Sequence, residues 1–214
     1  MNAAFKEDLH GAPVIAILRG VTPDTVLPVC EALVAGGMRF IEITLNSENA
    51  VASISKAAET LAPQGIHIGA GTVLSPEQVD LVAEAGGRYV ISPNTDADVI
   101  RRTKDHGLIS IPGFFTPSEA FTAAAAGADM LKCFPVGRLG PGYIKDLKAV
   151  LPVPVIAVGG VRAETVGDYF EAGAVAAGIG SSVYAPGRST AEIESAAKAF
   201  MASALAGMKG HSQT

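Results

Sequence analysis

The strongest constraint on the fold is an alternation that repeats eight times along the chain. Short runs rich in β-branched residues alternate with Ala-rich stretches whose apolar residues recur with the helical period. The expected strands cover residues 14–20, 40–46, 67–73, 89–94, 109–114, 130–135, 155–160 and 175–181. Strand-then-helix units spaced about 20 to 27 residues apart, with no linker between them, predict an α/β fold, a single closed (β/α)8 TIM barrel.

An open, doubly wound parallel sheet is the alternative arrangement of such units. That fold carries a glycine fingerprint after its first strand, where this chain has ILRGVTPD instead. We therefore predict one domain over residues 1–214, with the barrel at about 13–205 and a short polar tail after it. Ser-Pro or Thr-Pro pairs at 22–23, 75–76 and 116–117 predict helix N-caps, and glycines after the helical stretches predict C-caps.

Composition narrows the class of protein. Hydrophobic residues make up 49% of the chain and charged residues only 17%, which is enough apolar material for a sizeable core. A formal net charge of −5 argues against a surface for nucleic acid or anionic membranes. Residues 1–13 lack the apolar segment of a signal peptide, and no run reaches the ~20 apolar residues of a membrane helix. Cys30 and Cys133 fit no metal or redox spacing, so we expect reduced thiols and a cytoplasmic location.

The polar residues at the strand ends are the candidate site, because a barrel of this kind carries its functional groups at the C-terminal ends of its strands. Lys132 is the only one of eight lysines inside an expected strand, and Glu42 is the only acidic residue inside one. The other polar or glycine-rich strand ends are Arg19, Thr44, Asn46, Thr72, Pro93, Asn94, Gly159, Gly160, Gly180, Ser181 and Ser182. We expect Lys132 and Glu42 to meet in the barrel mouth.

Each of these residues also has a purely structural interpretation. Lys132 and Glu42 could form a buried ion pair, and Arg19 could lie across the barrel end. The Gly-Gly and Gly-Ser-Ser turns could be ordinary connections, and a lone threonine is more often structural than functional. These residues share one end of the same barrel, and this favours a functional site over the separate structural interpretations.

The chemistry of a buried lysine follows from its environment. Desolvation lowers the pKa of a lysine from ~10.4 toward ~7–8, which leaves a nucleophilic amine at neutral pH. Such an amine attacks a ketone to form a Schiff base, and the protonated imine then accepts electrons as a neighbouring carbon–carbon bond breaks. Glu42 is the candidate for the proton shuttle that this reaction needs.

The remaining strand ends predict the substrate. Backbone N–H groups at residues 159–160 and 180–181 resemble the phosphate site that barrels form after strands seven and eight. Arg19 or Thr72 could hold a carboxylate on the opposite side of the mouth. The expected ligand is a phosphorylated 2-keto acid. The four histidines form no metal-ligand cluster and the dinucleotide GxGxxG motif is missing, so no metal or cofactor is expected.

Nine motifs occur in order over about residues 13–200: AILRG, IEITLNS, GAGTVL, SPN, IPG, LKCFP, GPGYIKDLKAVLP, AVGGV and GIGSSVY. Together they resemble the 2-keto-3-deoxy-6-phosphogluconate/galactonate aldolase family. The resemblance implies a class I aldolase, with Lys132 as the Schiff-base lysine and Glu42 as the general acid/base. It implies a pyruvyl end lined by Arg19, Thr72, Pro93 and Phe134, and a phosphate site at Gly159, Gly160, Gly180 and Ser181. It also implies a homotrimer.

Within the family, Asn46, Asn94 and Val158 resemble the galactonate branch, because gluconate enzymes carry arginine, glycine and threonine there. Thr44 departs from the proline of the galactonate enzymes and supports neither branch. Losing a threonine hydroxyl at 158 is worth ~1–3 kcal/mol of discrimination between epimers. The expected reaction is cleavage of 2-dehydro-3-deoxy-6-phosphogalactonate to pyruvate and D-glyceraldehyde 3-phosphate, in galactonate catabolism. The alternatives are the gluconate epimer or both epimers, and, more remotely, a non-covalent phosphate-binding barrel enzyme or a sugar-phosphate sensor.

Overall fold

The strands and helices alternate along the chain as the sequence predicts. The computed structural model describes residues 3–211, with side chains through Met208. The strands are β1 (Val14–Leu18), β2 (Phe40–Thr44), β3 (His67–Gly71), β4 (Tyr89–Ile91), β5 (Ile109–Ile111), β6 (Gly113–Phe114), β7 (Leu131–Cys133), β8 (Val155–Val158) and β9 (Ala176–Ile179). The helices are α1 (Ala3–Gly11), α2 (Val26–Ala35), α3 (Ala50–Leu61), α4 (Pro76–Glu84), α5 (Ala97–Asp105), α6 (Pro117–Ala125), α7 (Pro141–Lys148), α8 (Val166–Glu171) and α9 (Thr190–His211), with 3-10 turns η1 (Ala62–Gln64) and η2 (Val136–Arg138).

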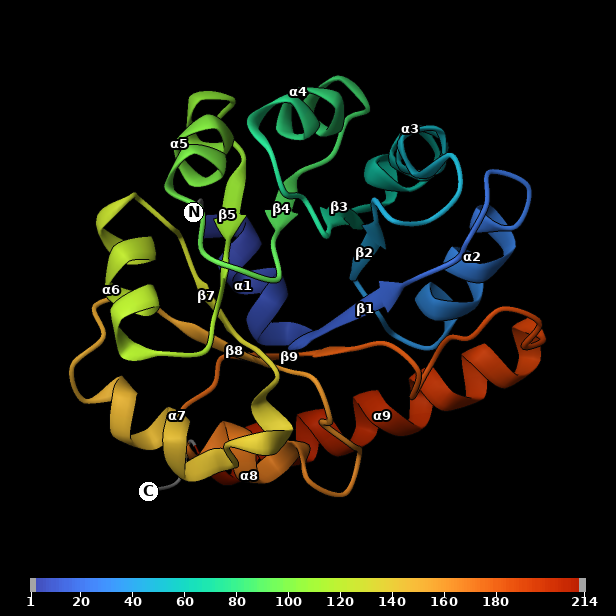
Figure 1. The fold of residues 1–214 in the computed structure, drawn as a ribbon. Helices are drawn as coiled ribbons and strands as arrows, with labels where there is room; N and C mark the ends of the chain where they lie inside the picture. The colour runs from blue at the N-terminus through green and yellow to red at the C-terminus, as the bar shows by residue number, and fades with distance from the viewer. Residues whose placement is uncertain (1–2, 212–214) are drawn as a thin grey trace.

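The strands form one parallel sheet in the order β5-β4-β3-β2-β1-β9-β8-β7-β6. β5 and β6 are two halves of one strand interrupted at Pro112, which has no N–H to donate to a neighbour. The Pro112 carbonyl accepts a hydrogen bond of 2.8 Å from the Lys132 N–H, so the interruption still bonds to β7. The nine segments thus occupy eight strand positions, and the predicted TIM-barrel-like (β/α)8 fold is confirmed (Figure 1).

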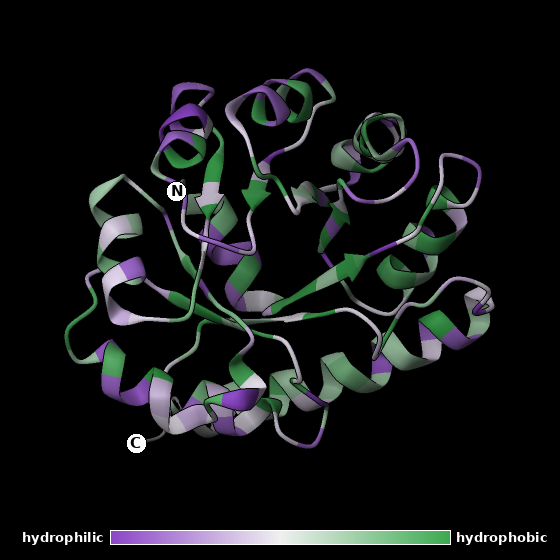
Figure 2. Ribbon diagram, viewed as in Figure 1, coloured by the Kyte–Doolittle hydropathy of each residue, from purple (hydrophilic) through white to green (hydrophobic). Residues whose placement is uncertain are grey.

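Apolar side chains fill two separate regions. One cluster lies between the outer face of the strands and the surrounding helices, and the other fills the barrel interior. Figure 2 shows hydrophobic residues along the strands and polar residues toward the outer faces of the helices. Strands buried on both faces need nearly continuous apolar runs, which is the pattern that the sequence carries.

Helix α1 was not expected from the sequence. Its Phe5 and Leu9 belong to the cluster inside the barrel, and the Phe5 ring meets Phe40 edge-on at 4.9 Å between centroids. Asp8 of the same helix accepts a hydrogen bond from Arg39 and lies 2.8 Å from Nε2 of His67, at the start of β3. Helix α1 therefore closes the N-terminal end of the barrel, which leaves the C-terminal ends of the strands as the open mouth.

The predicted helix boundaries are right in part. Ser75 and Thr116 cap α4 and α6 as expected, each accepting a hydrogen bond from a backbone N–H of the first turn. The cap expected at residues 22–23 is wrong: α2 begins at Val26, because Thr22 and Thr25 form a turn in which the Thr25 N–H donates to the Thr22 carbonyl.

The chain ends differently from the expected polar tail. Helix α9 runs on to His211, past residue 205, and packs against α2 and α8. The part of the predicted tail at 212–214 lies outside the described residues.

Three further features predicted from the sequence can be compared with the structure. Cys30 and Cys133 are free and buried, and burial raises the pKa of each thiol to about 12, so neither forms a reactive thiolate at neutral pH. No helix within residues 3–211 has the length and apolar character needed to cross a bilayer. Nor does this part of the chain gather three side chains of His, Cys, Asp or Glu into a potential metal site.

Candidate active site

Lys132 and Glu42 stand on opposite walls of the barrel. Lys132 is the middle residue of β7 and Glu42 the middle residue of β2, and both point inward by the alternation of the strands. Counting from β2, β7 is the fourth strand position in either direction around the barrel, so the two strands lie opposite each other. Lys132 is 6% exposed and Glu42 is 2% exposed. The sequence therefore placed both groups correctly inside the barrel.

The two groups perturb each other without forming an ion pair. Burial lowers the pKa of Lys132, the Glu42 carboxylate partly offsets this, and the Arg19 guanidinium adds to the lowering. Burial raises the pKa of Glu42, opposed by the charges of Lys132 and Arg19. Among the described residues, no salt bridge joins Lys132 to Glu42, which argues against the purely structural ion pair. The Lys132 ammonium lies 4.9 Å from the centroid of the Phe134 ring.

Two glycines make room for these side chains. A Cβ at residue 71 would lie 1.7 Å from Oε1 of Glu42, so the carboxyl group occupies the space that a side chain on β3 would take. A Cβ at residue 159 would lie 3.1 Å from the Phe134 ring, the ring that the Lys132 ammonium faces. The positions of the carboxyl group and the ring thus depend on neighbours that have no side chain.

Thr72 follows β3 in an unusual backbone conformation. Its φ is 57°, in the left-handed region that β-branched residues rarely adopt. The next residue is held on both sides: the Val73 N–H donates to the Ile91 carbonyl at 3.3 Å, and Ser92 Oγ donates to the Val73 carbonyl at 2.7 Å. Strain of this kind persists where the surrounding structure imposes it and is concentrated at functional sites. Sequence reasoning had singled out Thr72 but not Ser92.

A cavity of about 860 Å³ opens at the ends of β1, β8 and β9. Seven of the predicted site residues line it: Arg19, Phe134, Val158, Gly159, Gly160, Gly180 and Ser181. Arg162 lines it as well and was not predicted. Thr72 and Pro93 follow β3 and β4, which lie across the barrel from β8 and β9, and they are not part of this cavity.

The glycine turn after β8 leaves backbone N–H groups free at the cavity. Gly159 and Gly160 have φ of 90° and 85°, conformations that glycine adopts without strain. Within residues 3–211, the N–H groups of Gly160, Ser181 and Ser182 donate no hydrogen bond to the protein. Free backbone N–H groups around one cavity form a nest for a phosphate or carboxylate without a large positive patch.

A small polar network fixes the backbone on both sides of Arg19. Thr44 Oγ1 donates to the Leu18 carbonyl at 3.2 Å and lies 3.2 Å from Ser47 Oγ. Ser47 Oγ in turn accepts a hydrogen bond of 2.8 Å from the Gly20 N–H. This network joins the end of β1 to the end of β2. No local sequence pattern indicates it, because the partners are brought together only by strand pairing.

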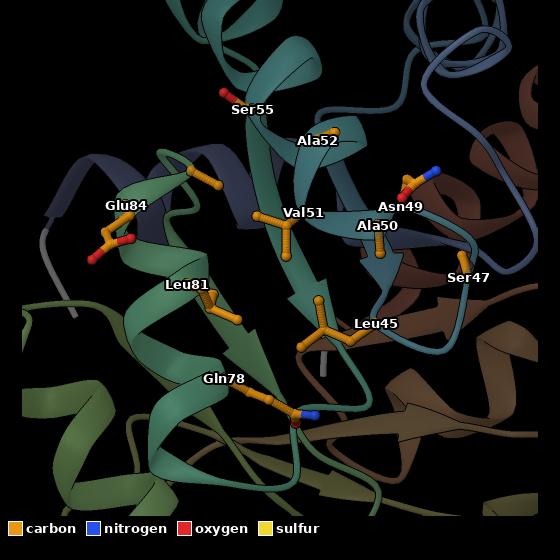
Figure 3. A pocket seen from close by; sticks show the side chains of 11 residues that line it. Leu45, Ser47, Asn49, Ala50, Val51, Ala52, Ser55, Gln78, Leu81 and Glu84 are labelled. Atoms are coloured by element: carbon orange, nitrogen blue, oxygen red, sulfur yellow. The ribbon is translucent and has the colours of Figure 1, made fainter.

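Another cavity, of about 710 Å³, lies on the outside of the barrel along α3 and α4 (Figure 3). Its lining includes Leu45, Val51, Gln78, Leu81 and Glu84 and contains no lysine, arginine or histidine. It therefore has no amine to attack a ketone and no positively charged side chain. Seven of the predicted site residues line the cavity at the barrel mouth instead.

Comparison with known proteins agrees with this geometry. Residues 5–196 match the aldolase family described as KDPG and KHG aldolase. The chain is 45% identical over 88% of its length to 2-dehydro-3-deoxy-6-phosphogalactonate aldolase of Escherichia coli, covering 93% of that protein. It is 46% identical over 89% of its length to a probable enzyme of the same name from Rhizobium meliloti, covering 90% of that protein.

Solved structures lead to the same family. A native KDPGal structure superposes with a TM-score of 0.89 at 43% identity, covering 92% of this chain and 96% of the other. KDPG aldolase from Legionella pneumophila, with pyruvate captured as a covalent carbinolamine intermediate, superposes with a TM-score of 0.76 at 26% identity, covering 94% of this chain and 96% of the other. The chain therefore belongs to the KDPG and KHG aldolase family and is an aldolase.

Proposed function

We propose that this aldolase cleaves 2-dehydro-3-deoxy-6-phosphogalactonate to pyruvate and D-glyceraldehyde 3-phosphate, in galactonate catabolism. One observation carries the proposal: the buried Lys132, whose pKa is lowered, faces the buried Glu42 beside a cavity lined by free backbone N–H groups. An amine, an acid/base and an anion site are the parts that Schiff-base cleavage of a phosphorylated keto acid requires.

The reaction begins at Lys132. Its neutral Nζ attacks C2 of the substrate to form a carbinolamine, and loss of water from the carbinolamine leaves a protonated imine. Glu42, acting through a water molecule, moves the protons of these steps, because the two groups stand on opposite walls and do not touch. The carbinolamine named for the Legionella pneumophila relative is the same kind of intermediate.

Carbon–carbon cleavage uses the imine as an electron sink. The C4 hydroxyl gives its proton to Glu42, the C3–C4 bond breaks, and its electron pair moves into the imine to form an enamine. D-Glyceraldehyde 3-phosphate leaves as the aldehyde. The enamine then takes a proton at C3 from Glu42, and water hydrolyses the imine to release pyruvate and restore the free Lys132 amine.

Substrate binding uses both sides of the mouth. The N–H groups around Gly160 and Ser181 suit the phosphate, together with Gly159 and Gly180. Arg19, Thr72, Pro93 and Phe134 are proposed to line the pyruvyl group: Arg19 and Phe134 from the same cavity as the glycine turns, Thr72 and Pro93 from across the barrel. Two contacts support this: Phe134 lies against the Lys132 ammonium, and the charge of Arg19 acts on both Lys132 and Glu42.

Two arguments support a preference for the galactonate epimer: the residue at position 158 and the sequence identity to enzymes named for that substrate. Val158 is buried in the barrel interior, 3% exposed. We propose that it stands where the threonine hydroxyl of the gluconate enzymes would contact one epimer. The chain is more similar to enzymes named for the galactonate substrate, at 45% and 46% identity, than to the KHG/KDPG aldolase of Escherichia coli, at 35%.

We also propose that the enzyme is a cytoplasmic homotrimer, in keeping with its free buried thiols and its exposed Phe115 and Phe121.

The test is imine trapping. Borohydride reduction in the presence of pyruvate should leave one reduced pyruvyl adduct per chain, located on Lys132 by peptide mass mapping. Lys132→Ala should abolish both the adduct and turnover, whereas Lys145→Ala, at an exposed lysine of α7, should leave both intact. Glu42→Gln should still form the adduct but cleave slowly, because it cannot accept a proton. A full adduct yield in Lys132→Ala would place the nucleophile on another amine, whereas a wild type that forms no adduct would leave a non-covalent enzyme or a sensor.

The same preparations decide the substrate. The wild-type kcat/KM should be higher for the galactonate epimer than for the gluconate epimer. Equal values would identify a dual-epimer enzyme, and the reverse order would place the chain functionally with the gluconate enzymes.

A further inference from the structure

A buried phenol without a hydrogen bond lies in the barrel beneath the proposed active site. Among the described residues, the buried side-chain polar atoms that lack a partner are Ser53 Oγ and the Tyr89 hydroxyl. Ser53 lies on α3, outside the barrel, whereas Tyr89 belongs to the cluster inside it. Nearly all buried hydroxyl groups are hydrogen-bonded to protein or to ordered water, so the position of Tyr89 requires an explanation.

Strand pairing puts Tyr89 in one row with Glu42. Glu42 of β2 pairs with Gly69 of β3, and the pairing of Ala70 with Val90 places Gly69 beside Tyr89 of β4. All three members of the row face the barrel interior. The middle member has no side chain, so nothing separates the tyrosine from the glutamate along this row.

The tyrosine ring occupies the gap. A Cβ at residue 69 would lie 2.4 to 2.5 Å from the ring carbons Cδ2, Cε2 and Cζ of Tyr89. The ring therefore extends from β4 across β3, and its hydroxyl end points toward β2, where Glu42 stands. The Glu42 carboxyl group itself lies over Gly71, one inward-facing position closer to the mouth. The hydroxyl is thus below the carboxyl group, on the closed side of the barrel.

Glu42 is the carboxyl group whose charge acts on Tyr89, and no hydrogen bond joins the two side chains in the structure. Phe5 of α1 meets the Tyr89 ring edge-on at 6.0 Å between centroids and covers it from the closed end. The charged groups that act on Glu42 are Lys132 from β7 and Arg19 from β1, and both are donors. Cys30 on α2 also acts on Tyr89, but burial keeps its thiol protonated.

We propose that Tyr89 is a positioning residue for Glu42, its hydroxyl donating a hydrogen bond to one buried water that in turn donates to the carboxyl group. The inference rests on the proposed acid/base role of Glu42 and adds a second residue to it. Burial raises the pKa of Tyr89 foremost, and the Glu42 charge raises it further, so the phenol keeps its proton and remains a donor. A donor that favours the ionised carboxylate opposes the effect of burial on Glu42.

The sign of the expected pH effect follows from this contact. Removing the donor destabilises the ionised form of Glu42 and raises its pKa further. Every limb of the pH–rate profile that Glu42 governs then moves to higher pH. The Tyr89→Phe variant removes only the hydroxyl and keeps the ring against Phe5 and Gly69, so it isolates this effect.

The experiment compares pH profiles of kcat for wild type, Tyr89→Phe and Tyr169→Phe. Tyr169 is a buried tyrosine of the outer cluster and serves as the matched control. Tyr89→Phe should lower kcat at neutral pH by about tenfold, a part of the 10²- to 10⁴-fold that general acid–base catalysis supplies, and leave KM nearly unchanged. Its acid limb should move to higher pH, while Tyr169→Phe should match wild type. In a Glu42→Gln background, Tyr89→Phe should have no further effect on the profile.

A second variant keeps the proposal testable should Tyr89→Phe fold poorly. Site-specific 3-fluorotyrosine at position 89 keeps the hydroxyl and makes it a stronger donor, so the Glu42 limb should move to lower pH. A packing effect would not produce opposite shifts in the two variants. A Tyr89→Phe profile identical to wild type, with Glu42→Gln still impaired, would overturn this inference alone. Full activity in Glu42→Gln would instead overturn the proposed function.

Discussion

At the scale of single residues, the positions of the reactive groups depend on glycines beside them. Gly69 makes room for the Tyr89 ring and Gly71 for the Glu42 carboxyl group, and both lie on the inner face of β3. Gly159 makes room for the Phe134 ring against which the Lys132 ammonium lies. Glycine in a strand usually weakens it, so glycines at these positions indicate a close approach of another group.

Replacing one of these glycines should therefore affect catalysis more than folding. In Gly71→Ala the new methyl group would overlap the Glu42 carboxyl group, which can rotate away but loses its position. We expect kcat to fall by at least about tenfold, since a displacement of about 1 Å can change a rate by about 10²-fold. Steady-state kinetics and urea denaturation would measure the two effects separately.

The control is Gly142→Ala in α7, where nothing lies within 4 Å of the added Cβ. This variant should keep wild-type kcat and gain about 0.4–1 kcal/mol of unfolding free energy, because alanine restricts the unfolded chain. Wild-type activity in Gly71→Ala would show that the carboxyl group does not need the space over β3.

At the scale of elements, α1 gives the barrel one closed and one open end. Phe5 is 2% exposed and its ring meets Phe40, His67 and Tyr89 edge-on at the N-terminal end of the barrel. Helix α1 also supplies the hydrogen-bond partner of His67 through Asp8. The helix thereby keeps water from the floor of the barrel, on which the environment of Lys132 and Glu42 depends.

Truncating the contact between α1 and the barrel should destabilise the protein. Phe5→Ala is expected to lower the free energy of unfolding by about 3–5 kcal/mol, the usual effect of removing a fully buried aromatic side chain. Phe5→Leu, which keeps most of the volume, should lower it by less than about 1.5 kcal/mol. Urea denaturation followed by circular dichroism measures both. A loss below about 1 kcal/mol in Phe5→Ala would mean that α1 contributes little to barrel stability.

At the scale of the whole molecule, the outer surface carries more exposed apolar side chains than an isolated barrel needs. Leu74, Leu81, Phe115 and Phe121 are 43% to 50% exposed, on α4, α6 and the segments before them. Large exposed apolar side chains can mark a surface that meets another protein. The proposed homotrimer would cover part of this surface.

Sedimentation measures the assembly directly. Sedimentation equilibrium at micromolar concentration should give a molecular mass of about 65 kDa, that of three chains of 21.8 kDa in a closed cyclic assembly. Phe121→Asp should reduce that mass, because a carboxylate in an apolar interface is strongly unfavourable. Val150→Asp, at a residue that is 62% exposed after α7, should not. A mass of one chain for the wild type would contradict the trimer.

The sequence alone determined the alternation of strands and helices, the closed parallel barrel and the inward position of Lys132 and Glu42. These features depend on local periodicity and on which few polar residues interrupt apolar strands, and both can be read from neighbours in the chain. Two predicted boundaries differ from the structure, at residues 22–23 and after 205; they concern a turn and a helix end, where local signals compete with packing.

Only the tertiary structure decided which groups meet across strands. It placed α1 beneath the barrel, joined Thr44 to Leu18 and Ser47 to Gly20 on either side of Arg19, and set Tyr89 across Gly69 toward Glu42. Most of these contacts join segments that are distant in sequence, and strand register brings them together when the barrel closes. A periodic pattern shows which face of a strand is inward, but it does not contain the register that decides what that face meets.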